Sequence, residues 1–332
     1  MPILTGATIL LTGGTGSFGQ MFTRYALSQN AKAIRIYSRG ELLQVEMDET
    51  FKNYRDNIRY FIGDVRDKDR LSRAMEGANI VVHAAALKHV PVAEYNPLEA
   101  VKTNILGSIN VVDCAIDTGV TRVIAVSTDK ACHPVNLYGM TKAVMEKIFI
   151  QSNVYTPYSK GKTILSCVRY GNVAGSRGSI IPIFLKQKPA GRITITDPEM
   201  TRFWITLNQG IEFVIHSLES MRGGEIFVPK LPSMRVIDLA QAMCPECEQE
   251  VIGIRPGEKL HETLITEDEA RRAREYEDCY VIPPEMSFWS NGEEPSGEPM
   301  EGPYTSGTNP VWLKEYELRR ILSEIRIIEP GK

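Results

Sequence analysis

The sequence predicts an α/β protein built on a doubly wound parallel sheet, with a smaller lobe in the C-terminal half of the chain. Short, continuous runs of apolar and β-branched residues alternate with longer amphipathic stretches over the first half. This alternation is typical of strand–helix–strand units whose sheet is covered on both faces. A glycine-rich turn also follows the first apolar run directly and opens a helical pattern, which is how the first strand and helix of such sheets are joined.

In chain order, six strands are expected at 8–13, 33–38, 58–63, 79–84, 122–127 and 163–171. Before the fifth strand, a helix is expected to begin with Pro97 in its first turn and to close at Gly119. After Gly171 the pattern breaks into shorter pieces. We therefore predict a sheet domain at 1–170, to which some later segments return, and a lobe at 171–332. Within that lobe, 283–310 is expected to be a surface loop and 311–325 the last helix.

Composition excludes several classes of protein. With a net charge of −3 the chain lacks the basic surface of a nucleic-acid binder. No apolar run approaches the roughly 18 residues that cross a bilayer, and the N-terminal residues resemble a strand more than a signal peptide, so we expect a cytoplasmic protein without a membrane partner. The six cysteines are dispersed and expected to be free thiols. Cys244 and Cys247 form a lone CxxC, which favours a surface loop over a metal site.

The glycine-rich turn predicts a dinucleotide site and makes the expected fold Rossmann-like. Gly14, Gly16 and Gly19 fit GxGxxG, and Gly13 with the last two fits TGxxGxxG. Glycines at this spacing permit a tight turn and let backbone N–H groups approach a pyrophosphate at a helix N-terminus. The residues expected to contact the cofactor here are Gly13, Thr15, Gly16, Ser17, Phe18 and Gly19.

Residues at the ends of the next strands favour NADP over NAD. The second strand ends at Ser38 and Arg39, where an NAD-binding protein usually places an acid, and an arginine suits a phosphate dianion. Glu41 could still turn toward a ribose. Further cofactor contacts are expected from Asp64, Val65, Ala84, Ala85 and Ala86. The domain at 1–170 is thus predicted to bind NADP, and the lobe at 171–332 mainly to bind substrate.

Tyr138 and Lys142 lie four apart on an expected helix and therefore share one face. A cation beside the phenol favours the tyrosinate, which can accept a proton while hydride leaves the same carbon. Thr128 offers a further hydroxyl to the substrate oxygen. This pattern, downstream of the glycine motif, indicates a short-chain dehydrogenase.

Asp129 and Lys130 follow the fifth strand at the edge of the sheet where ligands bind. Hydride transfer alone does not need this pair, but a newly formed ketone acidifies the neighbouring C–H. A base can then remove that proton while an acid assists loss of a hydroxyl, which is dehydration. The scheme requires Lys130 to be neutral part of the time, through burial or nearby positive charge, and Asp129 to hold a proton. The two side chains could share one proton.

Motifs along the chain to about residue 284 together resemble the inverting UDP-N-acetylglucosamine 4,6-dehydratases of the extended short-chain dehydrogenase/reductase family. They are the glycine loop, YSRGE, HAAALKHVP, STDKA, YGMTK, RYGNVAGSRGS, MTRFWIT, GGEIFVPK and IGIRPGEKLHE. The resemblance implies that Tyr138 takes the carbon 4 hydroxyl proton, Lys142 holds the nicotinamide ribose, Lys130 removes the carbon 5 proton and Asp129 protonates the carbon 6 hydroxyl. It implies that the product is UDP-2-acetamido-2,6-dideoxy-β-L-arabino-hexos-4-ulose and that the reaction is the first step toward pseudaminic acid.

For the substrate UDP-N-acetylglucosamine, the candidates to bind the diphosphate are Arg177, Arg202 and Arg255 with Lys259. Asn172 is expected near the phosphates, Glu258 is expected to accept from the uridine ribose hydroxyls, and Lys88 is expected near the sugar. The family also implies a homo-oligomer, with a hexamer as one form. Two other functions fit the fold: a nucleotide-sugar 4-epimerase, which has no use for Asp129 and Lys130, and a non-catalytic NADP-binding regulator, which would need neither Tyr138 nor Lys142.

Overall fold

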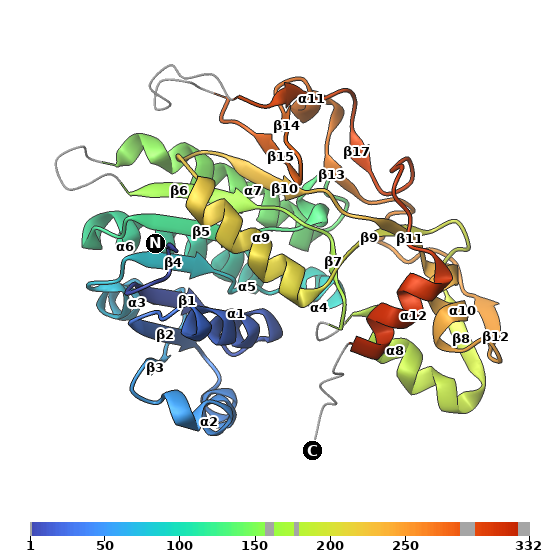
Figure 1. Ribbon diagram of the computed structural model, residues 1–332, viewed down its shortest axis with the longest axis horizontal. Coiled ribbons are helices and arrows are strands. Elements are labelled where there is room, and N and C mark those ends of the chain that lie inside the picture. Colours follow the sequence, from blue (N-terminus) through green and yellow to red (C-terminus); the bar gives the residue numbers. More distant parts are fainter. Residues whose placement is uncertain (1, 157–162, 176–178, 286–295, 325–332) are drawn as a thin grey trace.

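Residues 2–156, 163–175, 179–285 and 296–324 are described by a computed structural model, shown in Figure 1. Within these ranges the main sheet has the strand order β16-β14-β15-β10-β6-β5-β4-β1-β2-β3. Its members are β1 (Thr8–Thr12), β2 (Ala33–Ser38), β3 (Ile58–Ile62), β4 (Ile80–His83), β5 (Arg122–Val126), β6 (Ile164–Val168), β10 (Ile226–Pro229), β14 (Arg274–Glu275), β15 (Cys279–Ile282) and β16 (Glu298–Pro299).

All six strands expected in the first half are confirmed, and they pair in parallel. β10 adds a parallel strand beside β6, while β15, β14 and β16 extend the sheet antiparallel. The strand order reverses between β1 and β4. In open α/β sheets a ligand crevice lies beyond the carboxyl ends of the strands at this reversal, so the topology alone places the site.

Helices cover both faces of the main sheet (Figure 1). On one face α1 (Ser17–Ser28) packs beside α9 (Leu207–Ser220), and on the other α6 (Gly107–Thr118) packs between α3 (Lys68–Met75) and α7 (Leu137–Gln151). The helix expected over 97–119 is present but is divided by a π-helical turn, η2 (Lys102–Leu106), that follows α5 (Pro97–Val101). None of the described helices is long and apolar enough to cross a membrane.

A second apolar core forms the smaller lobe. It is built from α8 (Ile180–Gln187), α10 (Val236–Met243), α12 (Glu315–Glu324) and the parallel pair β8 (Arg192–Ile195) and β12 (Glu248–Val251). α12 packs on α10 and confirms the expected last helix. A separate sheet, β7 (Asn172–Val173), β9 (Thr201–Ile205) and β11 (Ser233–Arg235), brings further residues to the ligand cavity. The division of the chain at residue 170 stays a prediction.

The expectation of a plain surface loop over 283–310 is wrong for its described part. β16 joins the main sheet, and β17 (Tyr304–Thr305) pairs with β13 (Thr263–Ile265). Tyr304 and Ser306 are buried. Each of these strands is only two residues long. A pattern this short cannot be recognised within a Pro- and Gly-rich segment.

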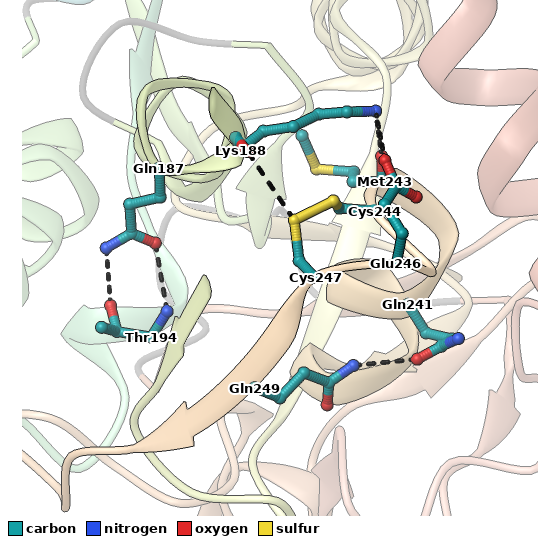
Figure 2. Close-up of a disulfide and its surroundings, with 9 residues drawn as sticks. All are labelled: Gln187, Lys188, Thr194, Gln241, Met243, Cys244, Glu246, Cys247 and Gln249. Carbon is teal, nitrogen blue, oxygen red and sulfur yellow. Dashed lines mark hydrogen bonds and ion pairs between the residues drawn. A yellow bond between two sulfur atoms is a disulfide. The ribbon is translucent and has the colours of Figure 1, made fainter. Parts of the chain in front are cut away.

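The expectation of free thiols on a surface loop is wrong for Cys244 and Cys247. Figure 2 shows them joined in a disulfide at the end of α10, and both are buried in the core of the lobe. The turn brings their Cα atoms to 5.3 Å, within the usual range for a disulfide, and Lys188 Nζ donates to the Met243 carbonyl beside it. The other four cysteines are free and buried, as expected of thiols.

Candidate active site

A cavity of about 1240 Å³ opens at the carboxyl ends of the parallel strands and extends to the smaller lobe. Almost every residue that the sequence singled out lines it. From the cofactor set these are Gly13, Thr15, Gly16, Ser17, Phe18, Ser38, Arg39, Asp64, Val65, Ala84, Ala85 and Ala86. From the catalytic and substrate sets they are Thr128, Asp129, Lys130, Tyr138, Lys142, Lys88, Asn172, Arg202, Arg255 and Glu258. Gly19 is the exception; it is buried at the start of α1. Arg177 lies outside the described residues.

The turn after β1 is shaped for a close ligand backbone. Gly13 has a φ of 70°, and a Cβ there would lie 2.9 Å from the backbone of Ala85 in the turn after β4. The two loops at the strand reversal therefore touch, and only glycine fits between them. Because α1 begins four residues later at Ser17, the cradle fits a dinucleotide pyrophosphate.

The end of β2 presents a cation at the cavity. Arg39 is half exposed, and its guanidinium lies 3.8 Å from Asp64. Asp64 is already bound by Arg66 at 2.7 Å; burial raises the Asp64 pKa, but the Arg66 hydrogen bonds outweigh it and lower the pKa. Ser38 is buried and accepts from Gln44. Glu41, the residue that would have favoured NAD, is exposed and does not line the cavity.

α7 carries Tyr138 and Lys142 into the cavity. Its N-cap Asn136 accepts from the Gly139 amide at 2.8 Å. A Cβ on Gly139 would lie 2.2 Å from the Lys130 carbonyl oxygen, so the glycine lets the helix rest directly on the turn that follows β5. The Lys142 ammonium donates to the Val126 carbonyl at 2.7 Å, and burial lowers the Lys142 pKa to about 8.

Lys130 is a cation that favours the tyrosinate of Tyr138 in this structure. Burial raises the pKa of Tyr138 to about 12; Lys130 and a hydrogen bond with Thr128 lower it, and Asp129 raises it. The four-residue spacing places Lys142 on the face of Tyr138, but its ammonium is directed to the strand backbone. Lys130 therefore lowers the pKa of the Tyr138 phenol and also forms an ion pair with Asp129.

Asp129 and Lys130 form a direct ion pair within the cavity. Lys130 Nζ lies 3.0 Å from Asp129 Oδ1, which also accepts from the Thr128 hydroxyl at 2.8 Å. Asp129 is 1% exposed, and its second oxygen, Oδ2, is buried without a hydrogen-bond partner. A buried carboxylate oxygen without a partner is costly, and here it is available to a substrate hydroxyl.

The scheme expected from the sequence requires burial or nearby positive charge to make Lys130 neutral part of the time. Burial and Arg202 do lower the Lys130 pKa, but the carboxylates of Asp129 and Glu262 outweigh them and raise it above its usual range. Lys130 Nζ lies 3.4 Å from Glu262 Oε1. Without substrate, Lys130 is therefore an ammonium ion between two carboxylates, and it becomes a base only by giving up this proton.

The substrate candidates occupy different parts of the cavity wall. Arg202 is 9% exposed; its guanidinium donates to the Thr201 and Leu260 carbonyls and pairs with Glu262. Its contacts in this structure are therefore with groups of the protein that build the cavity wall. Arg255 is exposed and lies 3.9 Å from Glu258. The segment that carries these two is held to α7, because Asn136 donates to the Gly257 carbonyl at 2.8 Å.

Sequence reasoning missed Glu262, although it ends the motif that contributed Glu258. The sequence shows Glu262 only as a second glutamate shortly after Lys259. Such a pattern is equally typical of a solvent-exposed turn. Also missed was an apolar part of the wall from the smaller lobe: Ile180, Ile183, Phe184, Met234 and Val236.

Comparison with known proteins agrees with this geometry. A family model described as polysaccharide biosynthesis protein matches residues 9–284. The chain is 48% identical to the UDP-N-acetylglucosamine 4,6-dehydratase (inverting) of Campylobacter jejuni, over 97% of this chain and 98% of the relative. It is 42% identical to the UDP-glucose 4-epimerase of Rickettsia rickettsii, over 83% and 82% of the two chains. The solved structure of Pen from Bacillus thuringiensis superposes with a TM-score of 0.88 at 38% identity, covering 97% and 99%.

Proposed function

The chain belongs to the polysaccharide biosynthesis protein family, and from this membership and the site we propose that it is an inverting UDP-N-acetylglucosamine 4,6-dehydratase. It is then a hydro-lyase that oxidises the sugar, eliminates water and reduces the product again with the same nicotinamide cofactor. The product is UDP-2-acetamido-2,6-dideoxy-β-L-arabino-hexos-4-ulose, which starts the route to pseudaminic acid. The relative of similar length at 48% identity supports this choice.

One observation carries the proposal: a buried carboxylate and an ammonium in contact, Asp129 and Lys130, lie beside Tyr138 in the cavity. Exchange of hydride at one carbon needs a proton acceptor such as Tyr138 and no more. A second acid–base pair is useful where a C–H and a C–O bond break on neighbouring carbons. Among dehydration, epimerisation and mere cofactor binding, only dehydration gives this pair a task.

The first step is oxidation at sugar carbon 4. Tyr138 accepts the hydroxyl proton, while Thr128 and Lys130 lower the pKa of the phenol and so stabilise its anion. A nicotinamide cofactor held by the glycine turn and the start of α1 would supply the hydride chemistry, taking hydride from carbon 4 and returning it to carbon 6. Lys142, held by the Val126 carbonyl, is placed to bind the ribose of the cofactor.

Elimination follows from the ketone. The Lys130 ammonium passes its proton to Asp129 along their 3.0 Å contact, which leaves an amine and a carboxylic acid. The amine takes the carbon 5 proton, the C–H electrons form the double bond to carbon 6, and the carbon 6–oxygen bond breaks. Asp129 gives its proton to the departing hydroxyl as water. Both side chains return to their starting charges. Once carbon 6 has received hydride, a proton from solvent reaches carbon 5 on the opposite face and inverts that centre, and the proton that Tyr138 accepted returns to solvent.

The preferred cofactor within this proposal is NADP. Gly13 and the start of α1 fit the pyrophosphate, and Arg39 at the end of β2 fits the 2′-phosphate. Arg39→Ala is expected to weaken NADP binding roughly 10- to 100-fold, because a charge-assisted hydrogen bond contributes about 1.5–3 kcal/mol. Binding of NAD, which has no phosphate there, should change little. Calorimetric titration of the purified protein with each cofactor measures both.

Arg59→Ala is the matched control, since Arg59 is an exposed arginine on the neighbouring strand β3 that donates to the Arg55 carbonyl. Equal losses of NADP and NAD affinity in Arg39→Ala, or a native protein that binds NAD more tightly than NADP, would contradict the choice of cofactor.

The test of the function is incubation with UDP-N-acetylglucosamine in deuterated water, followed by NMR. A dehydratase yields a 4-keto-6-deoxy sugar with deuterium at carbon 5, and the configuration at that carbon reports inversion. A 4-epimerase, the activity named for the Rickettsia relative, yields the galacto isomer without solvent label at carbon 5. A cofactor-binding regulator yields neither product.

We further propose a cytoplasmic homo-oligomer. Four of the six cysteines are free thiols, which fits a reducing compartment, whereas the Cys244–Cys247 disulfide is more usual in an oxidising one. α5, η2 and α6 run beside α7, and together these elements expose the apolar side chains Leu98, Leu106, Ile109, Met140 and Val144. An apolar patch of this kind marks an association surface, and a second copy of the chain offers a self-complementary one. Oligomers up to a hexamer are compatible with it.

Introducing a charge into this patch is expected to dissociate the oligomer. Leu106→Glu places a carboxylate on the apolar face and should shift the molar mass measured by light scattering to that of one chain. Val311→Glu, which alters an exposed apolar residue elsewhere, is the control and should keep the native mass. A native protein with the mass of a single chain, or identical masses for both variants, would exclude this surface.

A further inference from the structure

Glu262 is a buried carboxylate surrounded by three cations. Lys130 Nζ lies 3.4 Å from its Oε1, Arg202 Nε lies 3.8 Å from the same oxygen, and Lys259 Nζ lies 3.6 Å from Oε2. Glu262 is 2% exposed and lines the cavity, and its Oε2 has no hydrogen-bond partner. The burial, the cavity and the contact with the elimination base together single it out from the surface ion pairs.

The backbone of Glu262 is fixed by a separate set of hydrogen bonds. Its N–H donates to Ser306 Oγ at 2.9 Å, and its carbonyl accepts from the Ser306 amide at 2.8 Å. Ser306 in turn contacts Thr201 Oγ1 at 2.7 Å. The backbone of Glu262 is therefore held at a defined place, and the ion pairs with Arg202 and Lys259 hold its carboxylate beside the flexible Lys130 side chain.

The charges of this cluster allow Lys130 to change its protonation state. With Lys130 charged, Asp129 and Glu262 face three cations. When the proton moves from Lys130 to Asp129, Glu262 still faces Arg202 and Lys259, so no buried carboxylate loses all of its counterions. Loss of all partners would be costly, because an unpaired buried charge destabilises a protein strongly. Glu262 thus carries a negative charge that persists through the elimination cycle.

We propose that Glu262 is a positioning residue for dehydration, which anchors the Lys130 amine beside Asp129 and supplies the fixed negative charge that makes this amine a strong base toward carbon 5. The inference rests on the proposed function and deepens it. The amine takes the carbon 5 proton and becomes an ammonium ion, and Glu262 stabilises that ammonium while Asp129 has delivered its own proton to the leaving water.

The pH dependence of elimination follows from the charges that face Lys130. These are Asp129, Glu262 and Arg202, with Tyr138 on α7 and Lys259 behind Glu262. Elimination needs the Asp129–Lys130 pair to hold one proton between them. Because Glu262 favours the cationic form of Lys130, its removal lowers the pH at which the pair gains and loses each proton. Both limbs of the pH profile of kcat should therefore move to lower pH.

The experiment compares Glu262→Gln, Glu262→Asp and the control Glu250→Gln in the full-length protein with bound cofactor. Glu250 pairs with Arg192 on the surface of the smaller lobe. Glu262→Gln should lower kcat for dehydration roughly 10- to 100-fold, part of what a positioned base contributes, with little change in KM. Its kcat profile should move toward acid by about one pH unit or more, the usual effect of one nearby charge. Glu262→Asp, which keeps the charge, should retain the native pH profile. Glu250→Gln should behave like the native protein.

A second readout needs neither substrate nor cofactor. In protein labelled at the lysine ε-carbons, the NMR signal that disappears in Lys130→Ala is followed as pH is raised. It should titrate at lower pH in Glu262→Gln than in the native chain and Glu262→Asp. If the native protein forms no 4-keto product while this titration shifts, the proposed function fails and the charge coupling stands. Two outcomes overturn the inference when the native protein does form product. In the first, Glu262→Gln keeps the native pH profile and the native titration. In the second, Glu262→Asp shows the same shift as Glu262→Gln.

Discussion

Replacing Lys130 with alanine is expected to stop formation of the 4-keto-6-deoxy product. The rate should fall on the order of 10²–10⁴-fold, the usual contribution of a positioned general base. The variant loses the amine that removes the carbon 5 proton and also the proton source 3.0 Å from Asp129. In deuterated water the sugar should therefore acquire no label at carbon 5. NMR of the reaction mixture measures both product and label.

Hydride transfer should survive in this variant, with a changed pH dependence. Tyr138 remains in place, but Lys130 no longer lowers the pKa of the phenol, which burial has already raised to about 12. Single-turnover formation of reduced nicotinamide should thus be slow at neutral pH and recover as the pH rises. Lys68→Ala, which removes an exposed lysine paired with Asp113, is the control. Normal product formation by Lys130→Ala would refute the assigned base.

Replacing Arg169 with methionine is expected to lower the free energy of unfolding by about 3–5 kcal/mol, the cost of breaking a buried ion pair from one side. Arg169 is 2% exposed and donates to Glu146 at 2.9 and 2.6 Å and to Glu269 at two distances of 2.9 Å. Burial raises the pKa of Glu269, but Arg169 and Thr266 outweigh it and lower the pKa to about 2. The variant leaves both carboxylates buried and without this cation.

This arginine joins parts of the chain that build the site. Beyond the two glutamates it donates to the Leu264 carbonyl and contacts Cys132, which follows the Asp129–Lys130 turn. Urea unfolding followed by circular dichroism measures the loss. Adding Glu146→Gln to the variant should recover part of it, because one unpaired charge is removed. Arg235→Met, which breaks an exposed pair with Asp238, should cost less than about 1 kcal/mol. Equal midpoints for the two arginine variants would show that the buried pair adds no stability.

Local patterns were sufficient for the sheet and for most of the cavity lining. Each of the six strands is a continuous apolar run because both faces of a parallel sheet are buried, and a run of that kind is visible without neighbours. The glycine turn and the Tyr138–Lys142 spacing are equally local. The two-residue strands β16 and β17 were missed because they are strands only through their partners.

Three properties depended on which side chains the fold buries and brings together. Sequence reasoning asked for burial or positive charge around Lys130, and the fold also brings the carboxylate of Glu262 to it from a distant part of the chain. It paired Tyr138 with Lys142, and in the structure Lys130 lowers the pKa of Tyr138. It treated Cys244 and Cys247 as exposed thiols, yet the turn after α10 is buried and brings them together.

The sequence by itself thus determined the doubly wound sheet, the glycine turn at the cavity and the candidates for the acid, the base and the phenol. These follow from residue type and from spacing along one strand or helix. Only the tertiary structure decided the direction of the pKa shifts of Lys130 and Tyr138, the carboxylates that face Lys130 and the place of the smaller lobe's residues in the cavity. The physical reason is that burial and charge act through space, over a few ångströms, between residues that can lie far apart in the chain, as Lys130 and Glu262 do.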